Sequence, residues 1–164
     1  MTASYAMLAS ARRYVADYPG RDMSAAPATR VTIVACMDAR INPFALFGLA
    51  QGDAHILRNA GGAVTADVLR SLTISQRLLG TREIILVQHT DCGMLTFTDD
   101  GFKAALEAET GIRPAWATEA FTDLDANLRQ SMARIRIDPF VPHTSAIRGF
   151  VFDVRTGALR EVTS

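Results

Sequence analysis

Short apolar runs alternate with amphipathic stretches along most of this chain. Four runs rich in aliphatic and β-branched residues predict strands, which would span residues 31–36, 54–58, 83–88 and 147–154. Apolar positions at helical spacing and terminal capping residues predict helices, which would span residues 3–18, 65–80, 99–110 and 122–136. Because strands and helices alternate, we expect an α/β fold with a mostly parallel central sheet flanked by helices.

Residues at the ends of these segments support the boundaries. Thr65 is placed to cap the first turn of its helix, and Gly80 to end that helix in a left-handed conformation. Residues 1–29 hold the N-terminal helix and a linker rich in Ala and Pro, and no later composition change divides the chain. With 164 residues, we therefore expect one domain over 1–164.

The composition argues against a nucleic-acid-binding protein, a membrane protein and a disulfide-stabilised scaffold. The chain has 17 basic and 17 acidic residues, so its formal net charge is zero, and a polybasic surface for nucleic acid is not expected. The N-terminus lacks a basic segment followed by an apolar one, and the longest apolar run, residues 43–50, is much shorter than a membrane span. We expect a cytoplasmic protein that binds neither nucleic acid nor membranes, and its two cysteines exclude a disulfide scaffold.

Both cysteines follow predicted strand ends. Cys36 closes the first strand, while His89 and Cys92 follow the third. The carboxyl ends of parallel strands share one edge of a sheet, and two thiolates with one imidazole form a soft ligand set that favours zinc. Three ligands leave a fourth position open, which is typical of catalytic sites. Two other interpretations remain open: a buried structural Cys36, and a Cys–His nucleophile pair that leaves Cys92 without a role.

Several motifs in one order carry a family resemblance. They are Cys36-Met37-Asp38-Ala39-Arg40, Gly52-Asp53, Arg58-Asn59-Ala60-Gly61-Gly62, His89-Thr90-Asp91-Cys92-Gly93 and the last strand, Arg148-Gly149-Phe150-Val151-Phe152-Asp153. Together they resemble the β-class carbonic anhydrases, especially the short microbial members. The resemblance implies one Zn²⁺ per subunit held by Cys36, His89 and Cys92, and reversible hydration of CO₂ to bicarbonate by zinc-bound hydroxide. It also implies homodimers in which the N-terminal helix packs on the partner subunit.

The same resemblance assigns Asp38 and Arg40 as a catalytic dyad. Asp38 either pairs with Arg40 or takes the fourth position on the metal, and both arrangements occur in the family. Ala39 stands where the family usually has serine, which removes one hydrogen-bonding group beside the dyad. Two thiolates neutralise the charge of Zn²⁺, so we expect a weaker Lewis acid than a three-histidine site and activity that rises toward alkaline pH.

The remaining candidates surround this centre. We expect Gly61, Gly62 and Val64 to border a narrow substrate pocket, because glycines allow close backbone approach. Arg58 and Asp53 are expected to bond the loops around the site. Two histidines complete the set: His55 is expected in the core or at an interface, and His143 is either a proton shuttle or an ordinary loop residue.

Two rival functions stay open on the sequence. Carbonyl sulfide and carbon disulfide are linear molecules that the same scaffold could hydrolyse, with differences only in the pocket and its access. A non-catalytic zinc or redox-sensing protein would use Cys36 and Cys92 without turnover. The Asp38–Arg40 pair argues against a sensor, which has no need of a gate beside its metal.

Overall fold

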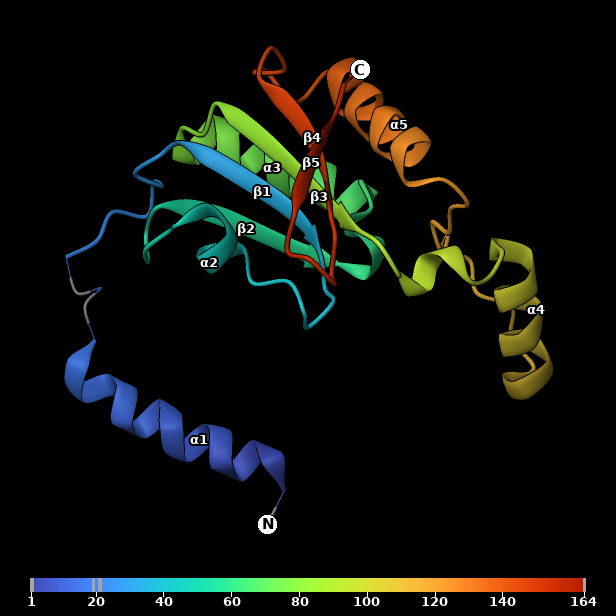
Figure 1. The fold of residues 1–164 in the computed structure, drawn as a ribbon, viewed down its shortest axis with the longest axis horizontal. Coiled ribbons are helices and arrows are strands. Elements are labelled where there is room, and N and C mark those ends of the chain that lie inside the picture. The colour runs from blue at the N-terminus through green and yellow to red at the C-terminus, as the bar shows by residue number, and fades with distance from the viewer. Residues whose placement is uncertain (1, 19, 21, 164) are drawn as a thin grey trace.

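The computed structural model describes residues 2–18, 20 and 22–163, and its centre is a five-stranded sheet in the order β2-β1-β3-β4-β5 (Figure 1). The strands are β1 (Val31–Cys36), β2 (Ala54–Asn59), β3 (Glu83–His89), β4 (Ile147–Phe152) and β5 (Leu159–Val162). The first four are parallel, and β5 runs antiparallel to β4. The expectation of a mostly parallel α/β sheet is confirmed.

Two long helices cover one face of the sheet. They are α3 (Ala66–Leu79) and α5 (Leu124–Ile137), and their buried side chains, Leu72, Leu128 and Met132 among them, pack against Val34 and Leu86 of the sheet. The short helix α2 (Pro43–Phe47) contributes Phe47 to the opposite face, against Ile33 and Ala35. Both faces of the sheet are thus covered at its central strands β1 and β3, as their near-continuous apolar residues require.

The capping residues act as their sequence predicts. The Thr65 hydroxyl accepts a hydrogen bond from the Val68 amide over 3.3 Å, and Gly80 ends α3 with a φ of 74°. Helix α4 (Asp99–Thr110) ends at Gly111 in the same left-handed conformation. The helix predicted over 122–136 is α5 and begins two residues later than expected, because the Asp123 side chain accepts from the Ala126 amide and so caps the first turn.

One helix and one strand were not predicted, and two predicted elements were too long. The run at 43–50 contains α2, and β5 follows the strand predicted over 147–154, which ends at Phe152. Strand β5 spans only four residues, and its two central side chains, Arg160 and Glu161, are exposed and paired with Asp125 and Arg148. The predicted N-terminal helix is α-helical only over α1 (Ala3–Tyr14) and continues as a 3₁₀ turn over Val15–Asp17.

Helix α1 projects from the body of the molecule (Figure 1). None of its twelve described residues is buried, and it presents large apolar side chains to solvent: Tyr5, Met7, Leu8 and Tyr14. The Tyr14 hydroxyl donates a 2.6 Å hydrogen bond to Gln51, which ties the end of α1 to the body. Whether α1 packs on a partner stays a prediction. No helix in the described part of the chain is long and apolar enough to cross a membrane.

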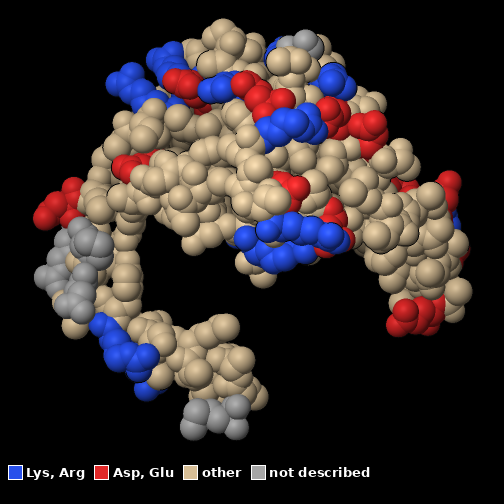
Figure 2. All heavy atoms as spheres, in the orientation of Figure 1, with Lys and Arg blue, Asp and Glu red and all other residues tan. Residues whose placement is uncertain are grey.

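On the face of the molecule shown in Figure 2, acidic and basic side chains lie next to one another over the body, so this face does not carry charge of one sign. Many of them are paired, including Arg148 with Glu161 at 2.7 Å and Arg160 with Asp125 at 2.6 Å. This mixture of signs agrees with the formal net charge of zero.

Candidate metal centre

Three potential metal ligands meet at the carboxyl end of the sheet. Strands β1 and β3 pair in parallel with Ala35 opposite Val87, so Cys36 and His89 end neighbouring strands. Cys92 follows three residues later and turns back toward them. One ligand atom from each residue lies within 4.8 Å of the others, and all three residues are buried. The parallel pairing therefore brings together residues that lie 53 and 56 positions apart in sequence.

The imidazole of His89 is oriented by its backbone neighbour. Its Nδ1 lies 2.8 Å from the Thr90 carbonyl oxygen, an acceptor only, so Nδ1 carries the proton. Nε2 then carries a free electron pair, and among the described residues this buried atom has no hydrogen-bond partner. Metal-binding histidines are held in this way by a second hydrogen bond. An unpartnered buried nitrogen beside two sulfurs fits a soft divalent cation such as Zn²⁺.

The contact between the two thiols shifts their pKa values in opposite directions. A hydrogen bond from Cys92 lowers the pKa of Cys36 to about 4, and the same contact raises the pKa of Cys92 above its usual range. For His89, burial lowers the pKa, but the neighbouring Cys36 and the Thr90 carbonyl outweigh burial and raise it. A thiolate is thus already favoured at Cys36, and binding of a cation would require loss of the proton that remains on Cys92.

Asp38 lies beside the cluster and is held by Arg40. The guanidinium donates to both carboxylate oxygens, over 2.9 Å from Nε and 2.7 Å from Nη2, and the Arg40 amide adds a 2.8 Å bond. The side-chain bond from Arg40 keeps the pKa of Asp38 far below its usual range. Asp38 Oδ2 is 3.7 Å from His89 Nε2, but Asp38 is not part of the ligand cluster. The structure shows the arrangement in which Asp38 pairs with Arg40.

Arg58 and Gly62 hold the backbone behind the site. Arg58 donates to the carbonyls of Cys36 and Asp38, the shorter bonds being 2.8 and 2.6 Å, which fixes the loop after β1. A Cβ at Gly62, which has a φ of 61°, would lie 2.9 Å from the Cys36 amide nitrogen. Only glycine allows this approach. Asp53, the other residue expected to be structural, accepts from the Ala50 amide over 2.7 Å.

The residues predicted to border the pocket occupy different places. Gly61 lines a cavity of about 400 Å³ together with the cluster and Asp38. Gly62 lies behind the ligands, as described above, and is not among the residues that line this cavity. Val64 is 3% exposed and belongs to the main core with Leu72 and Leu86, so its position does not form a pocket wall.

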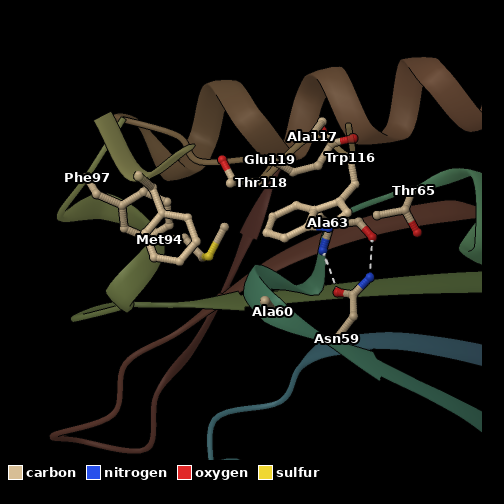
Figure 3. A pocket seen from close by; sticks show the side chains of 11 residues that line it. Asn59, Ala60, Ala63, Thr65, Met94, Phe97, Trp116, Ala117, Thr118 and Glu119 are labelled. Atoms are coloured by element: carbon tan, nitrogen blue, oxygen red, sulfur yellow. Dashed lines mark hydrogen bonds between the residues drawn. The ribbon is translucent and has the colours of Figure 1, made fainter. Parts of the chain in front are cut away.

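A second cavity of about 430 Å³ adjoins the first (Figure 3). The two share Ala60, Met94 and Phe97, and the second extends to Phe102 and Trp116. Asn59 and Ala63 line it and are hydrogen-bonded to each other. The Asn59 side chain accepts a hydrogen bond from the Ala63 amide and donates one to the Ala63 carbonyl, each over 2.8 Å (Figure 3). The surface that borders the ligand cluster is therefore mainly apolar.

The other two histidines lie away from the cluster. His55 is half-buried on β2 and contacts the Ser75 hydroxyl at 2.7 Å, as expected for a structural residue. His143 contacts Arg82 at 2.6 Å, just before β3 begins, whereas His89 ends that strand. The length of β3 places the two ends about 20 Å apart. His143 is therefore not a proton shuttle for the cluster of its own subunit.

Sequence reasoning missed the role of Asp91. From the sequence, Asp91 was treated only as one position of the His89–Cys92 motif and was given no function. In the structure, its carboxylate accepts a 2.9 Å hydrogen bond from Arg40 Nη1. Phe121 and Met94 were also missed; they pack with Cys36 and Cys92 in one apolar cluster. Asp91 offered one signal, since an acidic residue between two predicted ligands needs a partner. Phe121 offered none, because no local pattern relates it to the two cysteines.

Comparisons with known proteins agree on one family. The family model for carbonic anhydrase matches residues 31–136. The chain is 54% identical to beta-carbonic anhydrase 1 of Mycobacterium tuberculosis, over 99% of each chain. It is 35% identical to a carbon disulfide hydrolase of Saccharolobus solfataricus, over 88% of this chain and 83% of that one. The crystal structure of a carbonic anhydrase from Streptococcus mutans superposes with a TM-score of 0.92 at 41% identity, covering 99% of each chain.

Proposed function

The chain belongs to the β class of the carbonic anhydrase family, and we propose that it catalyses the reversible hydration of CO₂ to bicarbonate and a proton with one Zn²⁺ per subunit. The observation that supports this most directly is the buried Cys36–His89–Cys92 cluster with the carboxylate of Asp38 beside it. Among the residues that the structure describes, the cluster contains three ligands and no fourth, so a cation bound there would keep one position for solvent.

A Zn²⁺ ion bound there would act as a Lewis acid and activate water as a nucleophile. The residues around it would supply orientation. Asp38 is ionised and lines the cavity, so it can accept a hydrogen bond from a water molecule and direct the free electron pairs of that molecule toward the substrate carbon. Arg40 does not line the cavity, and its role is to hold the Asp38 carboxylate in place.

The apolar lining suits a substrate without charge. CO₂ is small and linear and has no hydrogen to donate, so apolar walls such as Met94 and Phe97 hold it mainly by excluding water. Bicarbonate is charged and would be held less well by the same walls. We therefore expect the cavity to favour entry of CO₂ and departure of bicarbonate into water.

The decisive experiment is CO₂ hydration by protein of known zinc content, from pH 6 to 9, with Cys92→Ser as the variant. We expect one Zn²⁺ per wild-type subunit and a rate that rises with pH. Cys92→Ser should lose most of the bound zinc and most of the hydration rate, because it removes one of the three ligands. A zinc-loaded wild type that exchanges no oxygen isotope between CO₂ and water would support the sensor alternative. Normal zinc content and rate in Cys92→Ser would refute the ligand assignment.

A second candidate substrate is carbon disulfide or carbonyl sulfide. The observation that favours it is the adjoining cavity, in which Phe97, Phe102 and Trp116 offer polarizable walls for a sulfur-containing molecule. The higher identity to a carbonic anhydrase supports CO₂ as the main substrate. Turnover of CO₂, carbonyl sulfide and carbon disulfide by one preparation distinguishes the two. A higher kcat/KM for either sulfur compound would reverse the assignment.

We propose that the chain forms a homodimer through α1. Its apolar residues are too exposed for an isolated subunit: Tyr5 is 65%, Met7 70% and Leu8 56% exposed. Light scattering after size exclusion should give a dimer for the wild type and a smaller species for Tyr5→Ser/Leu8→Ser. The matched control is Arg12→Ala on the same helix. A monomeric wild type, or a dimer that the double variant does not weaken, would contradict this assembly.

A further inference from the structure

Arg40 is held from two sides by acidic residues on different loops. Its Nε and Nη2 atoms face Asp38, while Nη1 donates to the Asp91 carboxylate over 2.9 Å and Nη2 to the Asp91 carbonyl over 3.1 Å. The two carboxylates thus use different edges of one planar guanidinium. Because both sets of bonds exist together, Asp91 does not compete with Asp38 for Arg40.

The backbone around Asp91 is built to aim it at Arg40. Asp91 has a φ of 58°, a left-handed conformation that Asp tolerates better than most residues. The preceding residue is fixed on both sides: the Thr90 amide donates to the Phe152 carbonyl over 3.0 Å, and its hydroxyl accepts from the Val154 amide over 3.1 Å. The end of β4 therefore holds the loop from which Asp91 reaches back to Arg40.

Exposure separates the roles of the three residues. The side chains of Asp38, Arg40 and Asp91 are 19%, 45% and 65% exposed, so they form a line from the cavity to solvent. Asp38 lines the cavity beside the ligand cluster, and Asp91 does not. Asp91 does not line the cavity, and its carboxylate contacts the site through Arg40.

We propose that Asp91 is a positioning residue that keeps Arg40 paired with Asp38, and so keeps the Asp38 carboxylate turned toward substrate and away from the metal position. Without the Asp91 carboxylate, Nη1 loses its partner, and only the bonds to Asp38 and to the backbone carbonyl of residue 91 hold the guanidinium. Asp38 would then be free to approach the ligand cluster. This inference depends on the proposed function only for its kinetic consequence, because the pairing itself is a property of the folded chain.

A double-mutant cycle between Asp91 and Arg40 tests the proposal. Asp91→Gly removes the carboxylate and keeps a residue that adopts the left-handed conformation freely, and Asp91→Asn removes only the charge. Both are made in the wild type and in Arg40→Ala. The matched control is Asp67→Asn, which breaks an exposed pair with Arg70 on α3, at 2.8 Å, away from the site. All variants are compared at equal zinc content.

We expect Asp91→Gly to lower kcat/KM for CO₂ by about two- to fivefold, as for loss of one exposed ion pair, with a smaller loss for Asp91→Asn. In Arg40→Ala, the same change should have no further effect. Asp67→Asn should keep the wild-type rate. Equal losses in both backgrounds, or no loss in the wild type, would overturn the proposal, because Asp91 would then act independently of Arg40 or not at all.

The unfolding equilibrium of the metal-free protein gives a readout that does not depend on turnover. Asp91→Gly should raise the unfolding constant about two- to fivefold more in the wild type than in Arg40→Ala. The altered backbone entropy of glycine is common to both backgrounds and cancels. A wild type without CO₂ hydration would refute the proposed function, whereas absence of this coupling would refute the role of Asp91.

Discussion

Two groups of polar residues meet at the carboxyl end of the sheet, and they are held by different forces. Cys36, His89 and Cys92 are at most 4% exposed, and the strands β1 and β3 with their apolar surroundings fix their positions. Asp38, Arg40 and Asp91 are partly in solvent and are fixed by bonds between charges. Packing in the interior thus fixes where the three ligand side chains lie. The ion pairs instead fix how the exposed side chains of Asp38, Arg40 and Asp91 are oriented.

This difference has a chemical reason. The thiols that bind a soft cation lose their protons when the metal binds, and burial protects these ligands from competing water. A carboxylate that binds a water molecule must remain ionised, and an arginine partner provides that without full burial. We therefore expect changes in the buried group to abolish the site and changes in the charged group to tune it.

The largest effect is expected from His89→Ala. It removes the one nitrogen ligand and leaves a buried gap between two thiols, so zinc affinity should fall by more than about 100-fold, and activity with it. Metal titration against a chromogenic chelator measures the affinity. Tight zinc binding by this variant would show that the cluster is not the metal site.

Asp38→Asn separates the two groups most sharply. The amide keeps the size of the carboxylate but loses its charge, so kcat/KM should fall by about 100-fold while zinc content stays at the wild-type level. Stopped-flow hydration with metal analysis of the same sample measures both. If the zinc is lost together with the activity, Asp38 belongs to the buried group, as a ligand or as its direct support.

Gly62→Ala tests how closely the buried group depends on backbone packing. The added Cβ would meet the Cys36 amide at 2.9 Å, and φ is 61°, so we expect a loss of about 2 kcal/mol or more in the free energy of unfolding. Gly80→Ala is the matched control, because its φ of 74° is similar but nothing lies within 4 Å of the added atom. It should lose only about 1–2 kcal/mol, the conformational part. Urea unfolding of the metal-free proteins gives both values, and equal losses would contradict the packing argument.

Asp99→Asn should have the smallest effect and extends the comparison to the loop beside the second cavity. Asp99 accepts from the Thr118 hydroxyl and from the Ala120 amide at 2.8 Å, and these bonds lower its pKa. A lowered pKa means that the stabilisation is fully present above the unfolded pKa of about 3.9 and is lost as pH falls through the lower folded value.

We therefore expect the wild type to exceed Asp99→Asn by about 1 kcal/mol near pH 7, and the difference to shrink as the pH falls from about 4 to 3. Urea unfolding of the metal-free proteins at several pH values measures this difference. A difference that does not change over this range would mean that the charge of Asp99 does not contribute.

Local sequence patterns predicted the elements whose preference for strand or helix is carried by their own residues. The β-branched run that forms β1 and the capped helix α3 needed only strand preference, helical spacing, Thr65 and Gly80. The antiparallel β5 could not be predicted in the same way. Its four residues are stabilised by pairing with β4 and by two ion pairs with distant residues, Asp125 and Arg148, which a local pattern does not contain.

The site shows the same division. Motif order and the types of Cys36, His89 and Cys92 sufficed to predict a soft three-ligand centre, because parallel strand ends meet at one edge. Val64 was expected in the pocket wall from its closeness in sequence to Gly61 and Gly62. In the structure, Val64 packs in the core after the turn at those glycines. The direction of the chain after this turn depends on the positive φ values of Gly61 and Gly62, which the residue types alone do not specify.

The sequence by itself determined the α/β class, the family and the three ligand types, since each of these is carried by local patterns and by the chemistry of the side chains. Only the tertiary structure decided that Asp38 pairs with Arg40 rather than joining the ligands, that Asp91 holds the other edge of Arg40, and that His143 lies at the far end of the sheet. These facts depend on distances between residues far apart in the chain. Such distances arise when the sheet and its helices pack together.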